Sequence, residues 1–501
     1  MKGLSSAPLR FSPTLPQLMA LDALVGAAAY ALAMVLRFVD EGSVPTTYAQ
    51  RLVPWIVIAA VVQIGTGELM SRLRRPTSRL ARRPIAPFLL ATGTSLVVVL
   101  VINDVLLRDA LAWRLPHFVA IVAPLLAGAA SAALRLAAAR SIDLEELLPR
   151  RSVPLDASAC RAVLANKRIL ITGGAGSIGA ELARQALGFG AESVLAVDMN
   201  ETGLYELEGE LASSRVGTCI ADVVDGRRMQ ELFIQVRPHI VFHAAAYKHV
   251  PLVEANPDQG FLTNVLGTLS VCEAAMASGA ERVVVISTDK AVNPSSFMGL
   301  TKRVAELIVA AMTPAQTRTV FSTVRFGNVL GSRGSVVPTL IRQIESGGPL
   351  TITDPDAQRF FMTLAEAAQL VLVACAFDGP GGVYVLDMGE EVRIEQLAER
   401  LMRLKGVRPG RDLSIQYVGL RPGEKLREEL HAADERLAPT DHAMVWRVVA
   451  AYDVDGVAVL DGVRELDRQR RAGELRPSDY ASRLRALVET AVQPTQAVAS
   501  R

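Results

Sequence analysis

The chain has 501 residues, half of them hydrophobic, with a mean hydropathy of +0.29 and a formal net charge of +2 at pH 7. The nearly balanced charge argues against a nucleic-acid partner, and an aromatic share of 5% weakens any base-stacking surface. The cysteines Cys160, Cys219, Cys272 and Cys375 form no CxxC pair, which argues against zinc ribbons and disulfide frameworks and suits a reducing compartment.

Four long apolar runs precede residue 140, namely Leu15–Val39, Leu52–Met70, Ala86–Leu106 and Leu115–Ala138. Each is near the roughly 20 residues that a helix needs to cross a bilayer. None has the regular polar face of a helix in a soluble bundle. The pattern predicts four transmembrane helices over residues 15–140 after a cytoplasmic tail of residues 1–14. Four buried helices of a soluble domain are the alternative.

Loop charges predict an orientation. The loop between the second and third runs carries Arg72, Arg74, Arg75, Arg79, Arg82 and Arg83, whereas the other two loops carry one and two arginines. Positively charged loops stay on the cytoplasmic side. We therefore expect a multi-pass protein of the cytoplasmic (inner) membrane, with the N-terminus and everything after residue 140 in the cytoplasm. Residues 141–166 are a predicted linker.

From residue 167 onward, short apolar strands alternate with helical segments, which is typical of a parallel α/β sheet. The first strand turns through Gly173, Gly176 and Gly179 into a helix. Such glycines allow a tight turn and close approach to a pyrophosphate at the helix N-terminus. This context predicts a dinucleotide site that includes Ser177 and Ile178.

Acidic residues end the next two strands. Asp198 follows Gly179 by about 20 residues, where a carboxylate can accept hydrogen bonds from an adenosine ribose. Asp222, with Val223, is expected to meet the adenine. Capping a helix is the alternative role for either aspartate. Because no arginine near Asp198 in the sequence can hold a 2′-phosphate, we expect NAD and not NADP.

Two later segments extend this predicted site. The fourth strand ends in Ala244, Ala245 and Ala246, which leave room for a flat cofactor, and Asn264 follows in the next segment. The fifth strand opens into the stretch ISTDKAVNPSSFMGLTK, residues 286–302.

This stretch carries Met298 four residues before Lys302. Many nicotinamide-dependent oxidoreductases have a proton-transferring tyrosine at that position, and a thioether is neither an acid nor a base. The site is therefore inactive, or other residues such as Asp289 and Lys290 do the chemistry.

The order of these parts, from about Lys167 to Leu430, resembles the extended short-chain dehydrogenase/reductase superfamily. More specific strings are HAAAYKHVPLVE, ISTDKAVNP, MGLTKRVAE, VRFGNVLGSRGSVVP, ITDPDAQRFFMT and GLRPGEKLREEL. In this order, after several membrane spans, they resemble the membrane-anchored bacterial UDP-N-acetylglucosamine 4,6-dehydratases of surface-polysaccharide synthesis. Long members carry a further nucleotide-binding-like domain before the catalytic one, and here only residues 141–166 fill that gap.

The resemblance implies a Rossmann-like, doubly wound parallel sheet that follows the membrane-helical region. Residues 167–325 would bind NAD, residues 326–462 would form a smaller, interleaved sugar-nucleotide part, and residues 463–501 would be a charged helical tail with a solvated face. Expected substrate contacts are Lys248, Asn328, Arg333, Arg359, Arg421 and Glu424. Arg325 lies in the same motifs, and a structural role is the alternative to substrate binding for this residue. The partners implied are a UDP-sugar and the lipid bilayer, with a homo-oligomer left open. His243, His249 and His431 show no metal-binding spacing, so no metal is expected.

The resemblance also implies a lyase that uses NAD as an internal redox carrier. Oxidation at C4 of the sugar makes the C5 proton acidic, so a base removes it while an acid protonates the departing C6 hydroxyl. Thr288 would orient the C4 oxygen and Lys302 would lower its proton affinity. Lys290 would be the base, made neutral by partial burial beside a cation, and Asp289 the acid, kept protonated by burial. A structural ion pair is the alternative for these two residues.

Three other functions stay open. A sugar-nucleotide 4-epimerase on the same scaffold needs the tyrosine that Met298 replaces. A 5-inverting 4,6-dehydratase shares the STDK-like string but keeps tyrosine and is typically soluble. A non-catalytic membrane scaffold or sensor would bind the nucleotide sugar only. Resemblance to the methionine-bearing branch implies that the C5 configuration is retained.

Overall fold

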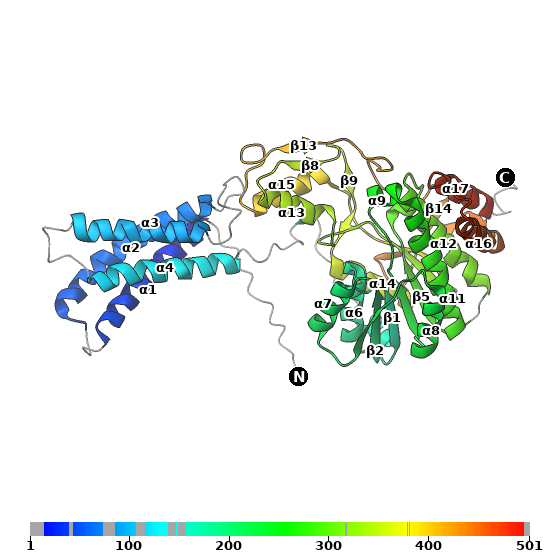
Figure 1. Ribbon diagram of the computed structural model, residues 1–501, viewed down its shortest axis with the longest axis horizontal. Coiled ribbons are helices and arrows are strands. Elements are labelled where there is room, and N and C mark those ends of the chain that lie inside the picture. Colours follow the sequence, from blue (N-terminus) through cyan, green and yellow to red (C-terminus); the bar gives the residue numbers. More distant parts are fainter. Residues whose placement is uncertain are drawn as a thin grey trace. The chain divides into compact units, whose positions relative to one another are not determined.

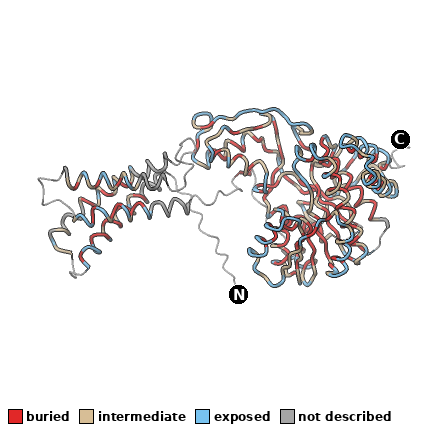
Figure 2. Tube along the Cα trace, in the orientation of Figure 1, coloured by how far each residue is buried: buried red, intermediate tan, exposed pale blue. Residues whose placement is uncertain are grey.

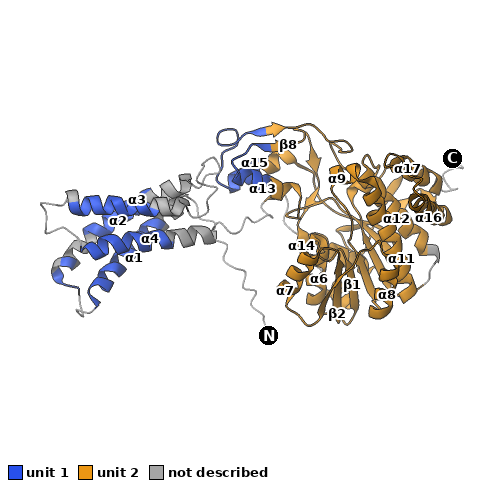
Figure 3. Cartoon of the chain, in the orientation of Figure 1, with its two compact units in different colours: residues 1–143, 340–350, 399–415 blue, residues 144–339, 351–398, 416–501 orange. Residues whose placement is uncertain are grey.

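The computed structural model describes residues 15–39, 44–73, 86–106, 116–138, 147–148, 157–315, 318–377, 379 and 381–494. The predicted N-terminal tail, most of the arginine-rich loop and most of the predicted linker lie outside these residues. The chain divides into two compact units (Figure 3). The first comprises residues 1–143, 340–350 and 399–415, and the second comprises residues 144–339, 351–398 and 416–501.

The first unit contains a bundle of helices at the positions of the four apolar runs. They are α1 (Leu15–Arg37), α2 (Thr46–Leu73), α3 (Ala86–Val101), which continues as the π-helical η3 (Ile102–Leu106), and α4 (His117–Ala138). Helix α1 packs against α2 and α4, and α3 packs against the same two helices (Figure 1). Tyr30, Met34, Trp55 and Val99 contribute to the apolar core of the bundle.

The bundle places large apolar side chains on its outer surface. Leu24, Val61 and Val97 are 68%, 66% and 60% exposed. Asp22 and Gln63, in contrast, are buried. Buried and exposed positions alternate along the described parts of these helices (Figure 2). A helical bundle in water has the opposite arrangement, with polar side chains outward.

Among the described residues, one helical stretch is long and apolar enough by composition to cross a membrane. It is Pro257–Ser278, and 61% of the apolar 18-residue window within it is buried. This stretch comprises α10 (Pro257–Gly260), the π-helical η6 (Phe261–Leu266) and α11 (Gly267–Ser278) of the second unit. Phe261, Val265 and Val271 within it belong to an apolar core, so it is a core helix of the α/β domain. Shorter apolar stretches lie in α2, α3–η3 and α4.

The second unit is built on a nine-stranded sheet with the order β14-β15-β11-β6-β5-β4-β1-β2-β3. Its parallel strands are β1 (Arg168–Thr172), β2 (Ser193–Asp198), β3 (Val216–Ile220), β4 (Ile240–His243), β5 (Arg282–Ile286), β6 (Val320–Arg325) and β11 (Gly382–Leu386). Strands β14 (Glu435–Pro439) and β15 (Val445–Ala450) are antiparallel. The order reverses between β1 and β4, and ligands of such sheets bind beyond the strand ends at this switch point. The expected doubly wound fold is confirmed.

Apolar residues along the central strands alternate between two cores. Leu170, Val241 and Val283 pack with α8 (Gly226–Val236), α11 and α12 (Phe297–Ala315) on one face. Ile169 and Phe242 pack with α5 (Ala157–Leu164), α6 (Ser177–Gly188) and α14 (Leu364–Ala376) on the other. Successive side chains of a strand point to opposite faces, so strands covered on both sides become nearly continuous apolar runs. This explains RILIT, IVFH and RVVVI.

The remaining elements complete the described chain. They are α7 (Glu201–Leu211), α9 (Val250–Ala255), the 3-10 turn η7 (Asp289–Ala291), α13 (Val336–Glu345), α15 (Ile394–Leu404), and the strand pairs β7 (Asn328–Val329) with β10 (Phe361–Met362), β9 (Gln358–Arg359) with β12 (Val392–Arg393), β8 (Leu350–Ile352) with β13 (Ile415–Tyr417), and β16 (Tyr452–Val454) with β17 (Val492–Pro494). Strands β11, β14 and β15, which follow residue 326, join the main sheet formed by the earlier strands.

The charged C-terminal segment forms two helices that also have a buried face. Helices α16 (Gly456–Arg471) and α17 (Asp479–Ala491) pack against α12. Val459, Val463 and Leu484 are fully buried in the same core as α12. Helix α16 carries four arginines, but its apolar residues recur at helical spacing, and that stripe determines the buried face.

Candidate active site

The glycine-rich loop joins β1 to α6 at the switch point of the sheet. Gly173 has a φ of +72°, and a Cβ added there would lie 2.5 Å from the amide nitrogen of Ala245. A Cβ on Gly179 would overlap the carbonyl oxygen of Gly173, and one on Gly176 would lie 3.1 Å from the same oxygen. The turn therefore needs glycine, and it lies against the alanines that follow β4.

Asp198 lies at the end of β2 and holds the glycine-rich loop. Its Oδ2 accepts a hydrogen bond of 3.0 Å from the amide of Ala175, and its Oδ1 accepts one of 2.9 Å from the amide of Asn200. Asn200, not Asp198, caps α7. Asp198 is thus placed beside the loop, as a ribose-binding carboxylate would be.

Asp222 follows β3, and its exposed side chain accepts a hydrogen bond of 3.0 Å from the amide of Val224. The cap of α8 is Asp225. The helix-cap alternative is therefore wrong for Asp222 too. The neighbouring Val223 is buried and lies against Gly267 of α11.

Asn264 is fully buried in η6 and ties three elements together. Its side chain accepts a hydrogen bond of 2.8 Å from the amide of Tyr247 and donates one of 3.0 Å to the carbonyl of the same residue. It also donates a hydrogen bond of 2.9 Å to Thr301 Oγ1 of α12. The structure gives Asn264 a loop-holding position behind the three alanines.

His243 ends β4 within a chain of hydroxyl groups. Its Nδ1 lies 2.7 Å from Thr172 Oγ1, and its Nε2 lies 3.1 Å from Thr268 Oγ1. Burial, with a smaller effect of the charge on Lys302, lowers the pKa of His243 to about 3. The imidazole is neutral at physiological pH, which agrees with the packing role expected for it.

Lys302 lies in the first two turns of α12 and is 5% exposed. Burial lowers the pKa of its ammonium to about 8, against the opposing charge of Glu306. Met298 lies one turn earlier on α12, is 3% exposed, and belongs to the apolar core of this helix. Residues four apart share a helix face, so the thioether takes the place beside Lys302 that a tyrosine would occupy.

The STDK segment leaves β5 and turns at η7. Thr288 Oγ1 donates a hydrogen bond of 2.8 Å to Asp289 Oδ1, and Lys290 Nζ donates one of 2.9 Å to the same oxygen. Lys290 Nζ also lies 3.5 Å from Asn328 Oδ1 and 3.4 Å from Glu428 Oε1. The predicted side-by-side acid and amine thus form an ion pair with two further polar neighbours.

The charge state predicted for Lys290 is wrong. Burial lowers the pKa of the Lys290 ammonium, but the carboxylates of Asp289 and Glu428 raise it by more, so the net shift is upward. The expectation of a neutral amine assumed a cation as its nearest neighbour. Two carboxylates lie nearer, so Lys290 carries a proton in the resting site.

Two carboxylate oxygens near Lys290 are buried without a hydrogen bond among the described residues. They are Oδ2 of Asp289, whose residue is 0% exposed, and Oε2 of Glu428. A Cβ on Gly327 would lie 3.1 Å from Asp289 Oδ2, so glycine there keeps the oxygen clear. Buried polar atoms in proteins are nearly always paired, and exceptions mark strained or catalytic groups.

Arg359, Glu424 and Arg421 meet near Glu428. Arg359 is 6% exposed, and its Nη2 lies 3.1 Å from Glu424 Oε1. The amide of the exposed Arg421 donates a hydrogen bond of 3.3 Å to Glu424 Oε2. Arg359 Nε also lies 3.9 Å from Glu428 Oε1, which connects this group to Lys290.

Sequence reasoning missed Glu428. It lies in the string GLRPGEKLREEL with two other glutamates, Glu424 and Glu429, and spacing alone does not separate the three. Of these, Glu428 has the buried side chain, 3% exposed. The signal in the sequence is the string itself, but the direction of each side chain depends on the fold of the loop.

Lys248 and Arg333, two of the expected substrate contacts, lie near the glycine-rich loop. Lys248 Nζ donates a hydrogen bond of 2.8 Å to the carbonyl of Arg333. The amide of Arg333 donates one of 3.0 Å to Ser177 Oγ, and its Nη1 donates one of 3.2 Å to the carbonyl of Ala175. Both residues therefore lie over the glycine-rich loop and not beside Arg359. No arginine lies near Asp198 in the sequence, but the fold brings Arg333 near it. The Nη2 atom of Arg333 is paired to Glu206 at 3.0 Å.

Arg325 has the structural role given as its alternative. It is 1% exposed, and its guanidinium forms hydrogen bonds of 2.7 Å to both carboxylate oxygens of Glu306 and of 2.6 and 3.0 Å to those of Glu435. Ser287 Oγ also donates a hydrogen bond of 2.7 Å to Glu306. This network joins β6, α12 and β14 directly behind the STDK turn.

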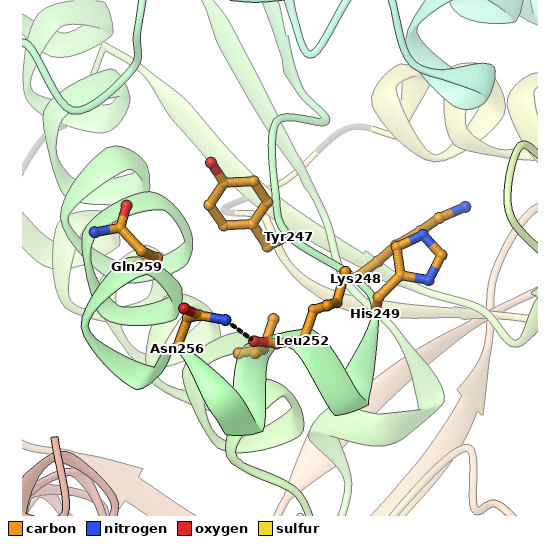
Figure 4. Close-up of a pocket in the computed structure, with 7 residues that line it drawn as sticks. Tyr247, Lys248, His249, Leu252, Asn256 and Gln259 are labelled. Carbon is orange, nitrogen blue, oxygen red and sulfur yellow. Dashed lines mark hydrogen bonds between the residues drawn. The ribbon is translucent and has the colours of Figure 1, made fainter.

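A separate cavity of about 260 Å³ lies along the segment that follows β4. It is lined by Tyr247, Lys248, His249, Leu252, Val253, Asn256 and Gln259. Figure 4 shows these side chains around α9, with the hydrogen bond of 2.8 Å from Asn256 to the carbonyl of Leu252. The STDK residues do not line it. Over the described ranges, no cluster of histidine, cysteine and acidic side chains could hold a metal ion.

Known proteins match this part of the chain. A family model described as polysaccharide biosynthesis protein matches residues 169–450. Capsular polysaccharide biosynthesis protein CapD of Staphylococcus aureus is 46% identical over 296 residues, which cover 58% of this chain and 49% of that protein. The chain therefore spans about half the length of that relative.

Other matches cover most of the matched protein. An uncharacterized membrane protein of Methanocaldococcus jannaschii is 46% identical, with 58% of this chain and 88% of that protein covered. UDP-glucose 4-epimerase of Rickettsia canadensis is 34% identical, with 59% and 90% covered. The X-ray structure of Pen from Bacillus thuringiensis superposes with a TM-score of 0.54 at 32% identity, covering 57% of this chain and 89% of that one.

Proposed function

Because the chain belongs to the polysaccharide biosynthesis protein family, we propose that it is a UDP-N-acetylglucosamine 4,6-dehydratase. It would convert the sugar nucleotide to its 4-keto-6-deoxy form for surface-glycan synthesis. The observation that carries this proposal is the Asp289–Lys290 pair, with N···O at 2.9 Å and the aspartate fully buried, close to a helix that has Met298 in place of a tyrosine. Elimination of water needs an acid and a base beyond the oxidation step.

NAD is the proposed cofactor. The glycine turn, which tolerates no Cβ at Gly173 or Gly179, and the Asp198 carboxylate beside it fit a pyrophosphate and an adenosine ribose. NAD, when bound, supplies a hydride acceptor for C4 and returns the hydride to C6. Arg333 lies close enough to the loop to require a direct test of NAD against NADP. Two features favour NAD: Arg333 is paired with Glu206, and Asp198 contributes a carboxylate.

Thr288 and Lys302 act at the C4 hydroxyl in this proposal. Thr288 Oγ1 orients the C4 oxygen, and it can do so because its own proton is directed to Asp289. The Lys302 ammonium lowers the proton affinity of the C4 oxygen. Since burial lowers the pKa of Lys302 to about 8, this help weakens as the pH rises through 8.

The resting charges favour Asp289 as the base and Lys290 as the acid, the reverse of the assignment from sequence. Asp289 Oδ2, which has no other hydrogen bond among the described residues, takes the C5 proton. Lys290 Nζ gives its proton to the C6 hydroxyl, and the C6–O bond breaks to release water. Asp289 then returns its proton to C5. We propose retention at C5, because one residue on one face does both transfers.

We also propose that the protein is anchored in the bacterial cytoplasmic membrane through α1 to α4. Apolar side chains such as Leu24, Val61 and Val97 face outward, and Asp22 and Gln63 face inward, which suits a lipid surrounding. One relative is named as a membrane protein. The catalytic part would lie in the cytoplasm, where sugar nucleotides are made.

A sugar-nucleotide 4-epimerase is the second candidate, favoured by the relatives named UDP-glucose 4-epimerase. An epimerase leaves C6 untouched, so Asp289 and Lys290 would have no task at that carbon. Met298 disfavours this candidate because the thioether transfers no proton.

The deciding experiment incubates full-length protein with UDP-N-acetylglucosamine and follows the sugar by NMR. A 4-keto-6-deoxy product supports the dehydratase, and its coupling constants report the configuration at C5. A UDP-N-acetylgalactosamine product means an epimerase. Binding without any product means a scaffold. Denaturing the protein and identifying the released nucleotide tests the cofactor, and predominant NADP would contradict the NAD proposal.

A further inference from the structure

Glu428 lies in the loop between β13 and β14, far in sequence from the STDK turn. Its side chain is 3% exposed, and its Oε1 lies 3.4 Å from Lys290 Nζ. Its Oε2 is buried without a hydrogen bond among the described residues. A carboxylate taken out of water and left half unpaired lowers stability, so its position needs a cause other than folding.

Lys290 Nζ is faced by charges from three elements. Asp289 lies on its own turn, Glu428 comes from the loop before β14, and Arg359 of β9 lies behind Glu428 at 3.9 Å. Asn328 of β7 adds a neutral oxygen at 3.5 Å. Arg359 also pairs with Glu424. The two charged groups nearest the Lys290 ammonium are the carboxylates of Asp289 and Glu428.

We propose that Glu428 is a positioning residue that holds the Lys290 ammonium in place through its Oε1 and keeps it protonated until the C6–O bond breaks. This inference rests on the proposed dehydration. Once Asp289 has taken the C5 proton it is neutral and no longer stabilises the ammonium. Glu428 takes part in neither proton transfer, so it still faces the ammonium when the acid is needed.

The first test measures the proton on Lys290 directly and needs no turnover. Full-length protein in detergent is labelled with acetic anhydride over a pH series, and the acetylation of Lys290 is quantified by mass spectrometry. In Glu428→Gln, the labelling midpoint of Lys290 should move to lower pH by about one unit, because one of two nearby opposite charges is lost. Glu429→Gln is the matched control, since Glu429 is exposed and pairs with Lys425 at 3.6 Å. Its midpoint should equal that of the wild type.

The second test separates positioning from folding. Glu428→Gln should keep bound nucleotide and C5 proton exchange with solvent deuterium, yet release water about 10- to 100-fold more slowly. Glu428→Asp, which keeps the charge but withdraws it by one methylene, should show a smaller shift of the labelling midpoint in the same direction. It also replaces Glu428→Gln if that variant does not fold.

An unchanged Lys290 midpoint in both variants overturns the inference, as does a loss of C5 exchange equal to the loss of water release. Failure of the proposed function is recognised separately, because the wild type would then form no 4-keto-6-deoxy product while the labelling midpoints could still be compared.

Discussion

Asp289 and Lys290 lie on one turn, and which of the two side chains carries a proton determines the catalytic role of each. The 2.9 Å ion pair and the raised pKa of Lys290 make the amine the proton donor. We predict that Asp289→Asn loses both C5 exchange and water release, whereas Lys290→Met keeps C5 exchange and loses water release. Each loss should be roughly two to four orders of magnitude, the usual scale for general acid and base catalysis.

Deuterium incorporation at C5 and product formation, both followed by NMR, measure these two effects. If Lys290→Met abolishes C5 exchange while Asp289→Asn retains it, the roles are those first expected from the sequence. Bound nucleotide should be unchanged in both variants, which serves as the control for folding.

Met298 is an apolar residue at a position where many nicotinamide-dependent oxidoreductases have a proton-transferring tyrosine. Since its buried side chain packs in the core of α12, Met298→Leu conserves volume and polarity and should keep the rate within about threefold of wild type. Turnover of UDP-N-acetylglucosamine is the measurement. An inactive Met298→Leu, together with a normally active Lys290→Met, would move the chemistry away from the STDK turn.

At the scale of elements, the start of α6 is limited by backbone contact. A Cβ on Gly179 overlaps the carbonyl oxygen of Gly173, so Gly179→Ala should push the loop out of place and abolish nucleotide retention. Gly188, at the end of the same helix, has no atom within 4 Å of an added Cβ. Gly188→Ala is the matched control and should retain the nucleotide, as measured by release on denaturation. Equal retention by both variants would mean that the loop does not hold the cofactor.

Helix α12, which carries Lys302, depends on the C-terminal helices that cover it. Val463 of α16 is fully buried in the shared core, whereas Val457 of the same helix is 71% exposed. Val463→Ala should lower the free energy of unfolding by about 2 kcal/mol, and Val457→Ala should change it by less than about 0.5 kcal/mol. Thermal unfolding of both variants measures the difference. Equal melting temperatures would mean that Val463 of α16 is not part of the buried core.

At the scale of the whole molecule, the bundle of α1 to α4 is proposed to anchor the catalytic unit to the membrane. The arginine-rich loop predicts that reporter fusions after residue 80 and after residue 160 both report cytoplasm. The protein should also stay with the membrane fraction after an alkaline carbonate wash. A periplasmic signal from either fusion would contradict the topology, and release by carbonate would contradict membrane spanning.

Local signals in the sequence were sufficient for much of this protein. Glycine spacing predicted the tight turn between β1 and α6, because the steric limit at Gly173 and Gly179 acts over a few residues. Continuous apolar runs predicted the parallel sheet, because strands buried on both faces need them. The STDK string and Met298 were recognised as adjacent to one another because they lie on one short segment.

What only the tertiary structure decided depends on residues distant in sequence. The charge of Lys290 changed from its expected state because the loop before β14 brings Glu428 within 3.4 Å. The fold likewise places Arg333 beside the glycine-rich loop, and it buries one face of the C-terminal helices. Coulomb energies and burial depend on distances in space, and a linear sequence specifies those distances only through the fold.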